Sequence, residues 1–297
     1  MEYDLEKIKA QFPVLNRKIW DKPLIYLDSA ASMQKPQKVL DAINNNYSFN
    51  YSNVHRGLHK LSEEATSNYE GARLKISKFI NCSEKEIVFT SGATAAINLV
   101  AYSWGLKNVS AGDEIIITIA EHHANIVPWQ LIAQQKGAKI IAAQVNPEED
   151  FDAEIIKQLV TDKTKIIAFP HVSNVLGTVF PVKEICKIAK ECGAISVVDG
   201  CQGIIHGTVD VKKLDCDFYC FSGHKLYGPT GIGVLYGKYK ILDEMPPFLG
   251  GGDMIDIVKI NQSTYADPPL RFEAGTPPIV EAIALGEAID WVVETGI

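Results

Sequence analysis

Short apolar runs alternate with amphipathic stretches along most of this chain. The runs are rich in isoleucine and valine, which is typical of strands that are buried on both faces of a sheet. The stretches between them predict helices at residues 93–104, 129–135, 152–159 and 182–191, with a final helix at 278–294. This alternation indicates an α/β fold with a mainly parallel sheet that helices cover on both faces. The predicted strands are residues 24–27, 86–90, 114–119, 139–145, 165–169, 195–198, 218–221 and 232–236.

The composition indicates a globular protein with a sizeable core. Of its 297 residues, 46% are hydrophobic, which suits one large or two medium domains. The formal net charge is −7 and no basic run occurs, so we expect no nucleic acid as a partner. No apolar stretch approaches the roughly 20 residues that a membrane-spanning helix needs, so we expect no membrane partner. The charged, amphipathic start is unlike a signal peptide, and we expect a cytoplasmic protein.

The six cysteines are too sparse for a disulfide framework in a chain of this length. Cys216 and Cys220 bracket a predicted buried strand. The alternation of side chains along a strand and the lack of a matching second pair favour structural thiols there over zinc ligands. We therefore expect no bound metal.

One lysine stands in an unusual setting just beyond a predicted strand. Lys225 lies in a glycine-rich turn, directly after a serine, a glycine and a histidine at residues 222–224. A lysine that forms a Schiff base needs such a setting, because its amine must be held close to neutrality and aimed at one carbonyl. Upstream, the apolar run at residues 195–198 ends on Asp199. This pair indicates a pyridoxal 5′-phosphate (PLP) site, with Asp199 on the pyridinium nitrogen and Lys225 on the aldehyde; an aspartate that caps a turn is the alternative for Asp199.

A second segment is suited to phosphate. Thr90-Ser91-Gly92-Ala93-Thr94 follows one predicted strand and opens a helix. Backbone N–H groups and the positive dipole end at the start of a helix attract phosphate, although an ordinary N-cap is the alternative. Ser222 and His224 beside the lysine offer further donors, and three such sites together strengthen the prediction.

Three more polar residues follow predicted strands. His122 is suited to stack on the cofactor ring, and a packed or capping histidine is the alternative. Asn174 and Gln202 are suited to hydrogen-bond the phenolic oxygen of the ring, although each alone would be ordinary turn polarity.

Together these segments resemble the class V aminotransferase family, and within it the cysteine desulfurases of the SufS and selenocysteine-lyase type. The motifs that carry this resemblance extend from the amino terminus through Thr276. They are Tyr26-Leu27-Asp28 with Ala30-Ala31, Asn53-Val54-His55-Arg56-Gly57, Glu121-His122-His123-Ala124-Asn125, His171-Val172-Ser173-Asn174, Ser222-Gly223-His224-Lys225, Gly250-Gly251-Gly252 and Arg271-Phe272-Glu273-Ala274-Gly275-Thr276.

The resemblance implies the large domain of a PLP-dependent transferase of fold type I, with a seven-stranded sheet. It implies an N-terminal helical arm at residues 1–20 and a PLP-binding large domain at residues 21–277. Residues 278–297 would begin the connecting helix to a C-terminal small domain, which we expect this chain to lack.

The resemblance also implies roles for individual residues. Lys225 is the Schiff-base lysine and proton shuttle, and His122 stacks on the ring as the second catalytic residue. Ala30, Arg56 and Asn174 lie close to the substrate. The remaining cofactor contacts are Ala93, Thr94, Asn174, Asp199, Gln202, Ser222 and His224, with Gly275 and Thr276 reaching the phosphate of the other subunit in a homodimer.

The implied reaction converts L-cysteine, or L-selenocysteine, to L-alanine. The freed Lys225 removes the Cα proton, the cofactor absorbs the charge, and an active-site thiolate attacks the substrate sulfur. Sulfur is left as an enzyme persulfide, for transfer to an acceptor protein and use in iron–sulfur cluster assembly.

The chain departs from the family pattern at several positions. After Pro278 it has no cysteine and no arginine, so we expect the nucleophilic cysteine and the carboxylate-clamping arginine of the family to be missing. Cys201 is the only cysteine beside the predicted site, and alternation turns it away if Gln202 faces the cofactor. Alanines at positions 93, 95 and 96 stand where the family usually has threonine, glutamate and glycine. Two alternatives stay open: a PLP-binding but catalytically silent dimer, and another class V enzyme, such as a kynureninase-like lyase.

Overall fold

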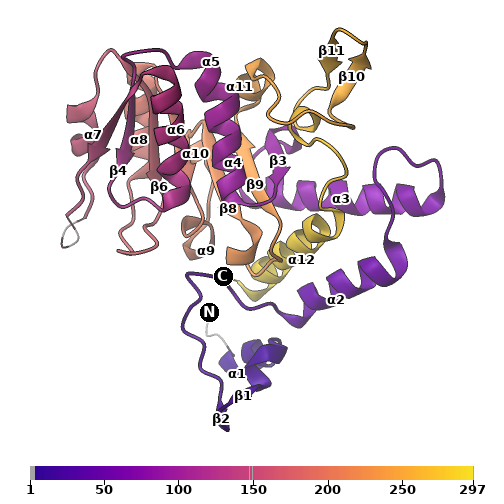
Figure 1. Ribbon diagram of the computed structural model, residues 1–297. Coiled ribbons are helices and arrows are strands. Elements are labelled where there is room, and N and C mark those ends of the chain that lie inside the picture. The colour runs from indigo at the N-terminus through magenta and orange to yellow at the C-terminus, as the bar shows by residue number, and fades with distance from the viewer. Residues whose placement is uncertain (1–3, 147, 149, 297) are drawn as a thin grey trace.

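A seven-stranded sheet forms the centre of the molecule, which the computed structural model describes at residues 4–146, 148 and 150–296 (Figure 1). The strands lie in the order β3-β9-β8-β7-β6-β4-β5. Neighbours are parallel, except that β9 runs antiparallel to both β3 and β8. The predicted mainly parallel, seven-stranded sheet is confirmed. Its strands are β3 (Ile87–Thr90), β4 (Glu114–Thr118), β5 (Lys139–Ala143), β6 (Thr164–Pro170), β7 (Ile195–Asp199), β8 (Phe218–Ser222) and β9 (Gly233–Gly237).

Helices cover both faces of this sheet, as Figure 1 shows. Successive strand residues alternate between two apolar clusters, as the pleat requires. Val197 and Phe218 pack with residues of α4 and α6, whereas Val198 and Tyr219 pack with residues of α3, α8 and α12. The predicted coverage of both faces is thereby confirmed. The larger helices are α2 (Gln37–Asn45), α3 (Lys60–Phe79), α4 (Ala93–Leu99), α6 (Val127–Lys136), α7 (Ala153–Leu159), α8 (Val182–Cys192) and α12 (Ile279–Thr295).

Shorter elements connect these parts. The helix α4 continues without a break through the π-helical η4 (Val100–Gly105) into α5 (Leu106–Asn108), so that one helical segment spans residues 93–108. A hairpin of β10 (Ile255–Val258) and β11 (Ser263–Tyr265) stands away from the sheet in Figure 1. The other short helices are α1 (Leu5–Lys9), η1 (Pro13–Asn16), η2 (Asn46–Asn50), η3 (Glu84–Glu86), η5 (His123–Asn125), α9 (Gly203–His206), α10 (Val211–Leu214), η6 (Gly223–Lys225), α11 (Tyr239–Glu244) and η7 (Leu270–Phe272).

The predicted strand at residues 24–27 is wrong. The short hairpin of β1 (Lys18–Ile19) and β2 (Lys22–Pro23) ends before it, and residues 24–27 have no regular structure. Ile25 and Leu27 are 79% and 90% exposed. The run is apolar enough for a strand, but none of the described strands pairs with it. Instead the Tyr26 hydroxyl donates to the backbone oxygen of Ser32 at 2.6 Å.

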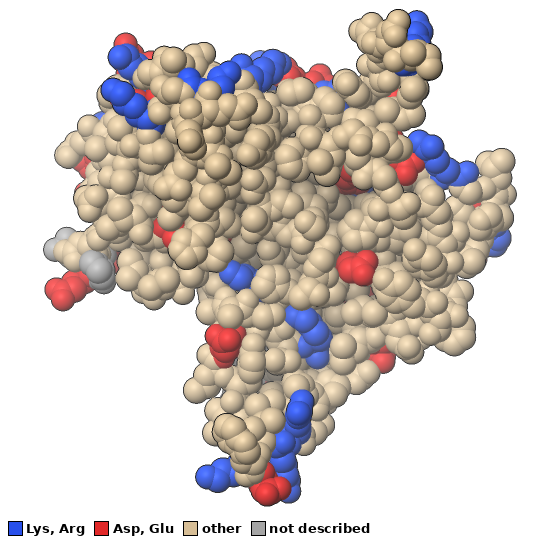
Figure 2. Space-filling model, in the orientation of Figure 1, with Lys and Arg blue, Asp and Glu red and all other residues tan. Residues whose placement is uncertain are grey.

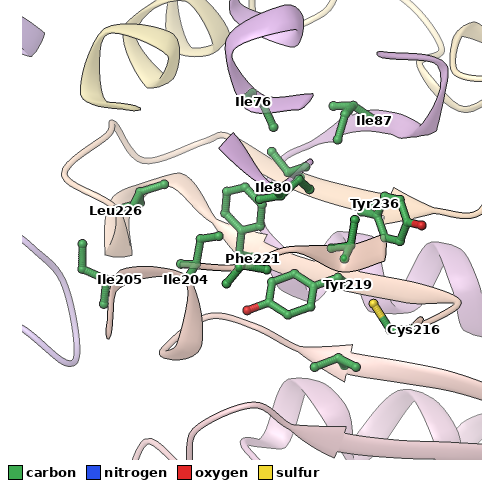
Figure 3. Packing of buried hydrophobic residues seen from close by; sticks show 14 of the residues in the cluster. Ile76, Ile80, Ile87, Ile204, Ile205, Cys216, Tyr219, Phe221, Leu226 and Tyr236 are labelled. Atoms are coloured by element: carbon green, nitrogen blue, oxygen red, sulfur yellow. The ribbon is translucent and has the colours of Figure 1, made fainter. Parts of the chain in front are cut away.

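The final helix packs on the body of the chain. Ala284 and Ala288 of α12 form a small apolar cluster with Val39 of α2. Gly286 lets α12 approach α3 closely, because a Cβ atom there would lie 3.0 Å from the Cβ of Ala72. Figure 3 shows Ile76 of α3 and Ile80, the residue directly after this helix, lying over the sheet. The division into an arm at 1–20, a large domain at 21–277 and a connecting helix at 278–297 stays a prediction.

Charged side chains are spread thinly over the visible surface. Basic residues on the face in Figure 2 lie in separate small groups, and much of that face carries no charge. Across the described residues, no helix combines the length and apolar character needed to cross a membrane. All six cysteines are free thiols, and no group of three or more metal-binding side chains occurs in the described part of the chain.

Candidate active site

A cavity of about 450 Å³ opens at the carboxyl ends of the parallel strands, where open α/β sheets bind their ligands. It collects residues from segments that are far apart in the sequence. Nine of the predicted site residues line it, namely Ala30, Ala93, Thr94, His122, Asn174, Asp199, Ser222, His224 and Lys225, together with Asp28, Ala31, Ala124 and Cys201. The structure therefore brings most of the predicted site together.

Lys225 projects from the turn η6, directly after β8. This turn is tight because the Gly223 N–H donates to the Ile232 oxygen at 2.9 Å, and a Cβ on Gly223 would lie 2.7 Å from the Ile232 side chain. Within the described residues, no carboxylate forms an ion pair with the Lys225 amine. The amine is thus left available to a ligand in the cavity.

Asp199 is the last residue of β7 and is only 6% exposed. Its Oδ1 accepts a hydrogen bond from the Cys201 N–H at 3.0 Å, which fixes the carboxyl group at the strand end. Because β7 and β8 are parallel neighbours, Asp199 and Lys225 reach the same end of the sheet. A buried carboxylate that lines a cavity is suited to a positively charged ligand atom.

His122 is held by its own turn. Its Nδ1 accepts a hydrogen bond from the Ala124 N–H at 3.1 Å, so the ring caps η5. Burial lowers the pKa of His122, and the nearby Lys225 lowers it further. A neutral ring that lines the cavity is suited to contact an aromatic ligand.

A buried polar network that the sequence did not reveal supports this turn. Glu121 accepts hydrogen bonds from the Thr118 hydroxyl at 2.6 Å and from the Asn125 amide at 2.7 Å. The Asn125 oxygen in turn accepts from the indole N–H of Trp129 at 2.9 Å. Burial raises the pKa of Glu121 well above its ordinary value, which favours the neutral acid. Only the polarity of these residues beside His122 could have hinted at the network.

The other end of the cavity carries hydroxyl and N–H groups. The Ser222 oxygen accepts from the Ala93 N–H at 2.9 Å, which leaves the Ser222 hydroxyl hydrogen free to donate. Gly92 has a φ of +155°, and a Cβ on the neighbouring Gly233 would lie 2.4 Å from its Cα. Two glycines are therefore required where the start of α4 meets β9. Thr94, the second residue of α4, also lines the cavity.

The N-terminal segment forms one wall of the site. The Gln202 side chain donates to the Ala30 oxygen at 2.7 Å, and the Met33 N–H donates to the His224 oxygen at 3.0 Å. Lys35, which was not predicted as a site residue, donates to the oxygens of Met33 and His224. Burial lowers the pKa of Lys35 to about 8. The hydrogen bond to the Ala30 oxygen uses one donor of the Gln202 amide group, so the protein backbone holds this side chain.

Four predicted site residues are not part of the lining of this cavity, and Gln202, whose side chain donates to the Ala30 oxygen, is one of them. Arg56 forms an ion pair with Asp253 on a half-exposed surface. Thr276 lines a neighbouring cavity of about 420 Å³, together with Thr90 and Ser91. The preceding residue, Gly275, has a φ of +81°. The predicted roles of Gly275 and Thr276 involve a second subunit, and the roles of all four residues stay predictions.

Cys201 lines the cavity but is poorly suited to nucleophilic attack. It is 7% exposed, and burial together with Asp199 raises the pKa of its thiol far above the ordinary value. Thiolate, rather than thiol, is the reactive form. The expected alternation, with Gln202 facing the cofactor and Cys201 turned away, is wrong, because Cys201 lines the cavity whereas the Gln202 side chain donates to the Ala30 oxygen. The burial of the thiol nevertheless makes Cys201 a poor substitute nucleophile.

These features coincide with a known family. The sequence profile described as Aminotransferase class-V matches residues 25–297. The chain belongs to the class-V aminotransferase family.

Its relatives include cysteine desulfurases. One from Salmonella typhimurium is 51% identical, over all of this chain and 74% of that relative. The crystal structure of the cysteine desulfurase CsdA from Escherichia coli is 40% identical with a TM-score of 0.89, and covers 99% of this chain and 73% of that one. The apo structure of a cysteine desulfurase from Thermococcus onnurineus is 39% identical with a TM-score of 0.93, over 100% of this chain and 72% of that one. The predicted resemblance and the predicted fold type are confirmed.

Proposed function

We propose that the chain is a PLP-dependent cysteine desulfurase, which converts L-cysteine to L-alanine and passes the sulfur to a thiol as a persulfide. The single observation that carries this proposal is the placement of Lys225 and Asp199. They stand at the ends of neighbouring parallel strands and line one cavity. The relatives named cysteine desulfurase support the choice of reaction.

The residues present fit PLP in chemical type. An amine, a buried carboxylate and a set of hydroxyl and N–H donors line the same cavity, as an aldehyde, a pyridine nitrogen and a phosphate require. Lys225 would hold the aldehyde carbon, and Asp199 the ring nitrogen. His122 would pack on the ring, while Asn174 and Gln202 would contact the ring oxygen or substrate. Ala93, Thr94, Ser222 and His224 would hold the phosphate.

When bound, PLP supplies an electron sink for charge that develops on the substrate Cα. Lys225 would accept the Cα proton from cysteine and return a proton during turnover, because none of the described carboxylates holds its amine in an ion pair. His122 stays neutral through its bond from Ala124, so it adds no positive charge beside Lys225. Ala30, Arg56 and Asn174 would lie close to the substrate.

The sulfur step requires an accessible thiolate. The C–S bond of the substrate breaks as an S–S bond to that thiol forms, and the carbon skeleton takes up protons to become alanine. We further propose a homodimer, in which Gly275 and Thr276 reach the partner's phosphate, and a sulfur-acceptor protein that serves iron–sulfur cluster assembly. Selenocysteine as a substrate and a cytoplasmic location stay predictions.

A second candidate function is PLP binding without desulfurase turnover. The state of Cys201 favours it, because the one thiol that lines the cavity is buried and held protonated. PLP loading and turnover must therefore be measured separately.

The test is alanine release from L-cysteine by the PLP-loaded protein with reductant present. Loading is first confirmed by visible absorption, and Lys225→Ala serves as the control. Alanine formed by the wild type and not by the variant supports a desulfurase. Loaded protein that forms no alanine would contradict desulfurase activity and leave the second candidate.

A further inference from the structure

One buried arginine outside the cavity holds together segments from distant parts of the chain. Arg73 of α3 is 2% exposed, and its guanidinium forms a bidentate pair with Glu273 at 2.7 and 2.9 Å. The same guanidinium donates to the Ile87 oxygen at 2.8 Å and to Glu70 at 2.9 Å. A planar guanidinium is suited to several directed bonds of this kind.

Glu273 is the second member of this buried pair. It accepts from the Phe89 N–H at 2.7 Å and from the Tyr69 hydroxyl at 3.1 Å, in addition to the two bonds from Arg73. Its carboxylate is therefore satisfied by four donors, although it is only 8% exposed. The aromatic ring of Phe89 also lies 4.6 Å from the Arg73 guanidinium carbon. Such a pair fixes the relative positions of the backbones that carry it.

Two of the anchored backbones lead directly into predicted phosphate residues. Ile87 and Phe89 belong to β3, which runs straight into the segment 90–94 with Thr94. Glu273 is three residues before Thr276, and the intervening Gly275 N–H donates to the Gly252 oxygen at 2.9 Å. Thr90, Ser91, Glu273 and Thr276 line one cavity. The arginine thus sets the spacing between these two segments.

The third anchored segment carries Arg56. Glu70 accepts from Arg73 and also contacts the His55 ring at 2.9 Å. Burial opposes the ionisation of Glu70, but the hydrogen bonds from His55 and Arg73 lower its pKa to about 2. Glu70 therefore stays ionised, and it links Arg73 to the segment with Arg56. That segment is conformationally constrained, since His55 has a φ of +68°.

We propose that Arg73 is a positioning residue for the phosphate end of the cofactor site. Through Glu273 and β3 it fixes the segment 90–94 and the loop 273–276 relative to each other. This inference rests on the proposed function and its homodimer, because it takes the segment 90–94 to hold the phosphate of this subunit's PLP and the loop 273–276 to reach the phosphate bound by the partner subunit. Arg73 itself does not line the cavity that holds Lys225.

The test compares the binding of PLP with that of pyridoxal, which lacks the phosphate. Arg73→Lys and Arg73→Met are measured beside the wild type, and Glu273→Gln is a milder variant that keeps an acceptor for the Phe89 N–H. Ile185→Ala, in α8, which packs on β6 and β7, is the matched control for a general loss of stability. Folding of each variant is checked by circular dichroism and thermal unfolding.

We expect the Arg73 variants to bind PLP at least about tenfold more weakly, with pyridoxal affinity unchanged to within about twofold. Arg73→Lys recovers little, because an ammonium cannot replace the bidentate fork. Glu273→Gln shows the same selective loss, and Ile185→Ala shows none.

Two results would overturn the inference alone: equal weakening of PLP and pyridoxal, or unchanged PLP affinity in folded Arg73 and Glu273 variants. A wild type that fails to bind PLP would instead overturn the proposed function on which the inference rests. The two failures are therefore distinguishable.

Discussion

The Nδ1 atom of His122 accepts a hydrogen bond from the backbone N–H of Ala124 at 3.1 Å. An acceptor nitrogen carries no proton, so the neutral ring must carry its proton on Nε2. Protonation of Nδ1 would break this cap and place a second positive charge close to Lys225. Local backbone geometry thus determines both the tautomer and the charge of a ring that lines the cavity.

We therefore expect the pKa of His122 to lie below about 6.5, the usual value for histidine. Because folding lowers the pKa of His122, the contribution of this residue to the free energy of unfolding is fully present above about pH 6.5. It is lost as the pH falls through the folded-state pKa. NMR titration of ¹⁵N-labelled histidine, with His122→Gln for assignment, measures both the pKa and the tautomer. A pKa above about 6.5, or a proton on Nδ1, would contradict this account.

For Glu121 we expect the opposite dependence of stability on pH. Its folded-state pKa is raised, so its contribution to stability is present at low pH and is lost as the pH rises through that pKa. Glu121→Gln keeps the polar contacts and has no such proton. Relative to the wild type it gains stability from pH 5 toward pH 8, by up to about 1.4 kcal/mol per pH unit. Denaturant unfolding at several pH values measures the difference, and the exposed Glu244→Gln should give a flat profile. A flat profile for Glu121→Gln would show that Glu121 is ionised in the folded protein.

Ser222→Ala removes the acceptor for the Ala93 N–H between β8 and α4. A buried donor without a partner costs about 1–3 kcal/mol, so the free energy of unfolding should fall by that amount. PLP binding should weaken by about tenfold, since Ser222 is also proposed to contact the phosphate. Ser91→Ala, on the exposed side of the same segment, should change stability by less than about 0.5 kcal/mol. Equal effects of the two substitutions would contradict the role given to Ser222.

Cys201 should resist thiol reagents. Its buried, protonated thiol predicts alkylation by iodoacetamide far more slowly than that of Cys192, which is only partly buried. Peptide mapping after timed alkylation of the native protein gives both rates. Labelling of Cys201 as fast as Cys192 would reopen its role as the sulfur-accepting thiol.

The sequence predicted the sheet well because buried parallel strands are continuous apolar runs. It failed at residues 24–27, where an equally apolar run finds no neighbouring strand. Most of the predicted residues that line the cavity could be found because they end a strand or lie in the turn after it, as Asp199 and Lys225 do. Ala30 is an exception, since it follows the irregular residues 24–27. The contacts that support these residues could not be predicted from the sequence. Arg73 and Glu273 are 200 positions apart, and Lys35 donates to the His224 oxygen across 189 positions. Such contacts depend on tertiary packing, which no local pattern reports.

Lys225 is the residue that we propose to bind PLP covalently. Lys35 is the natural competitor, because it lies beside the site and its pKa is lowered to about 8, which makes its amine more reactive. Its amine, however, is engaged by the oxygens of Met33 and His224 and does not line the cavity.

The measurement is reduction of the PLP-loaded protein with borohydride, followed by mass spectrometry of its peptides. We expect the adduct on Lys225 and none on Lys35, and we expect Lys225→Ala to lose the adduct. An adduct on Lys35, or an adduct that survives in Lys225→Ala, would contradict it.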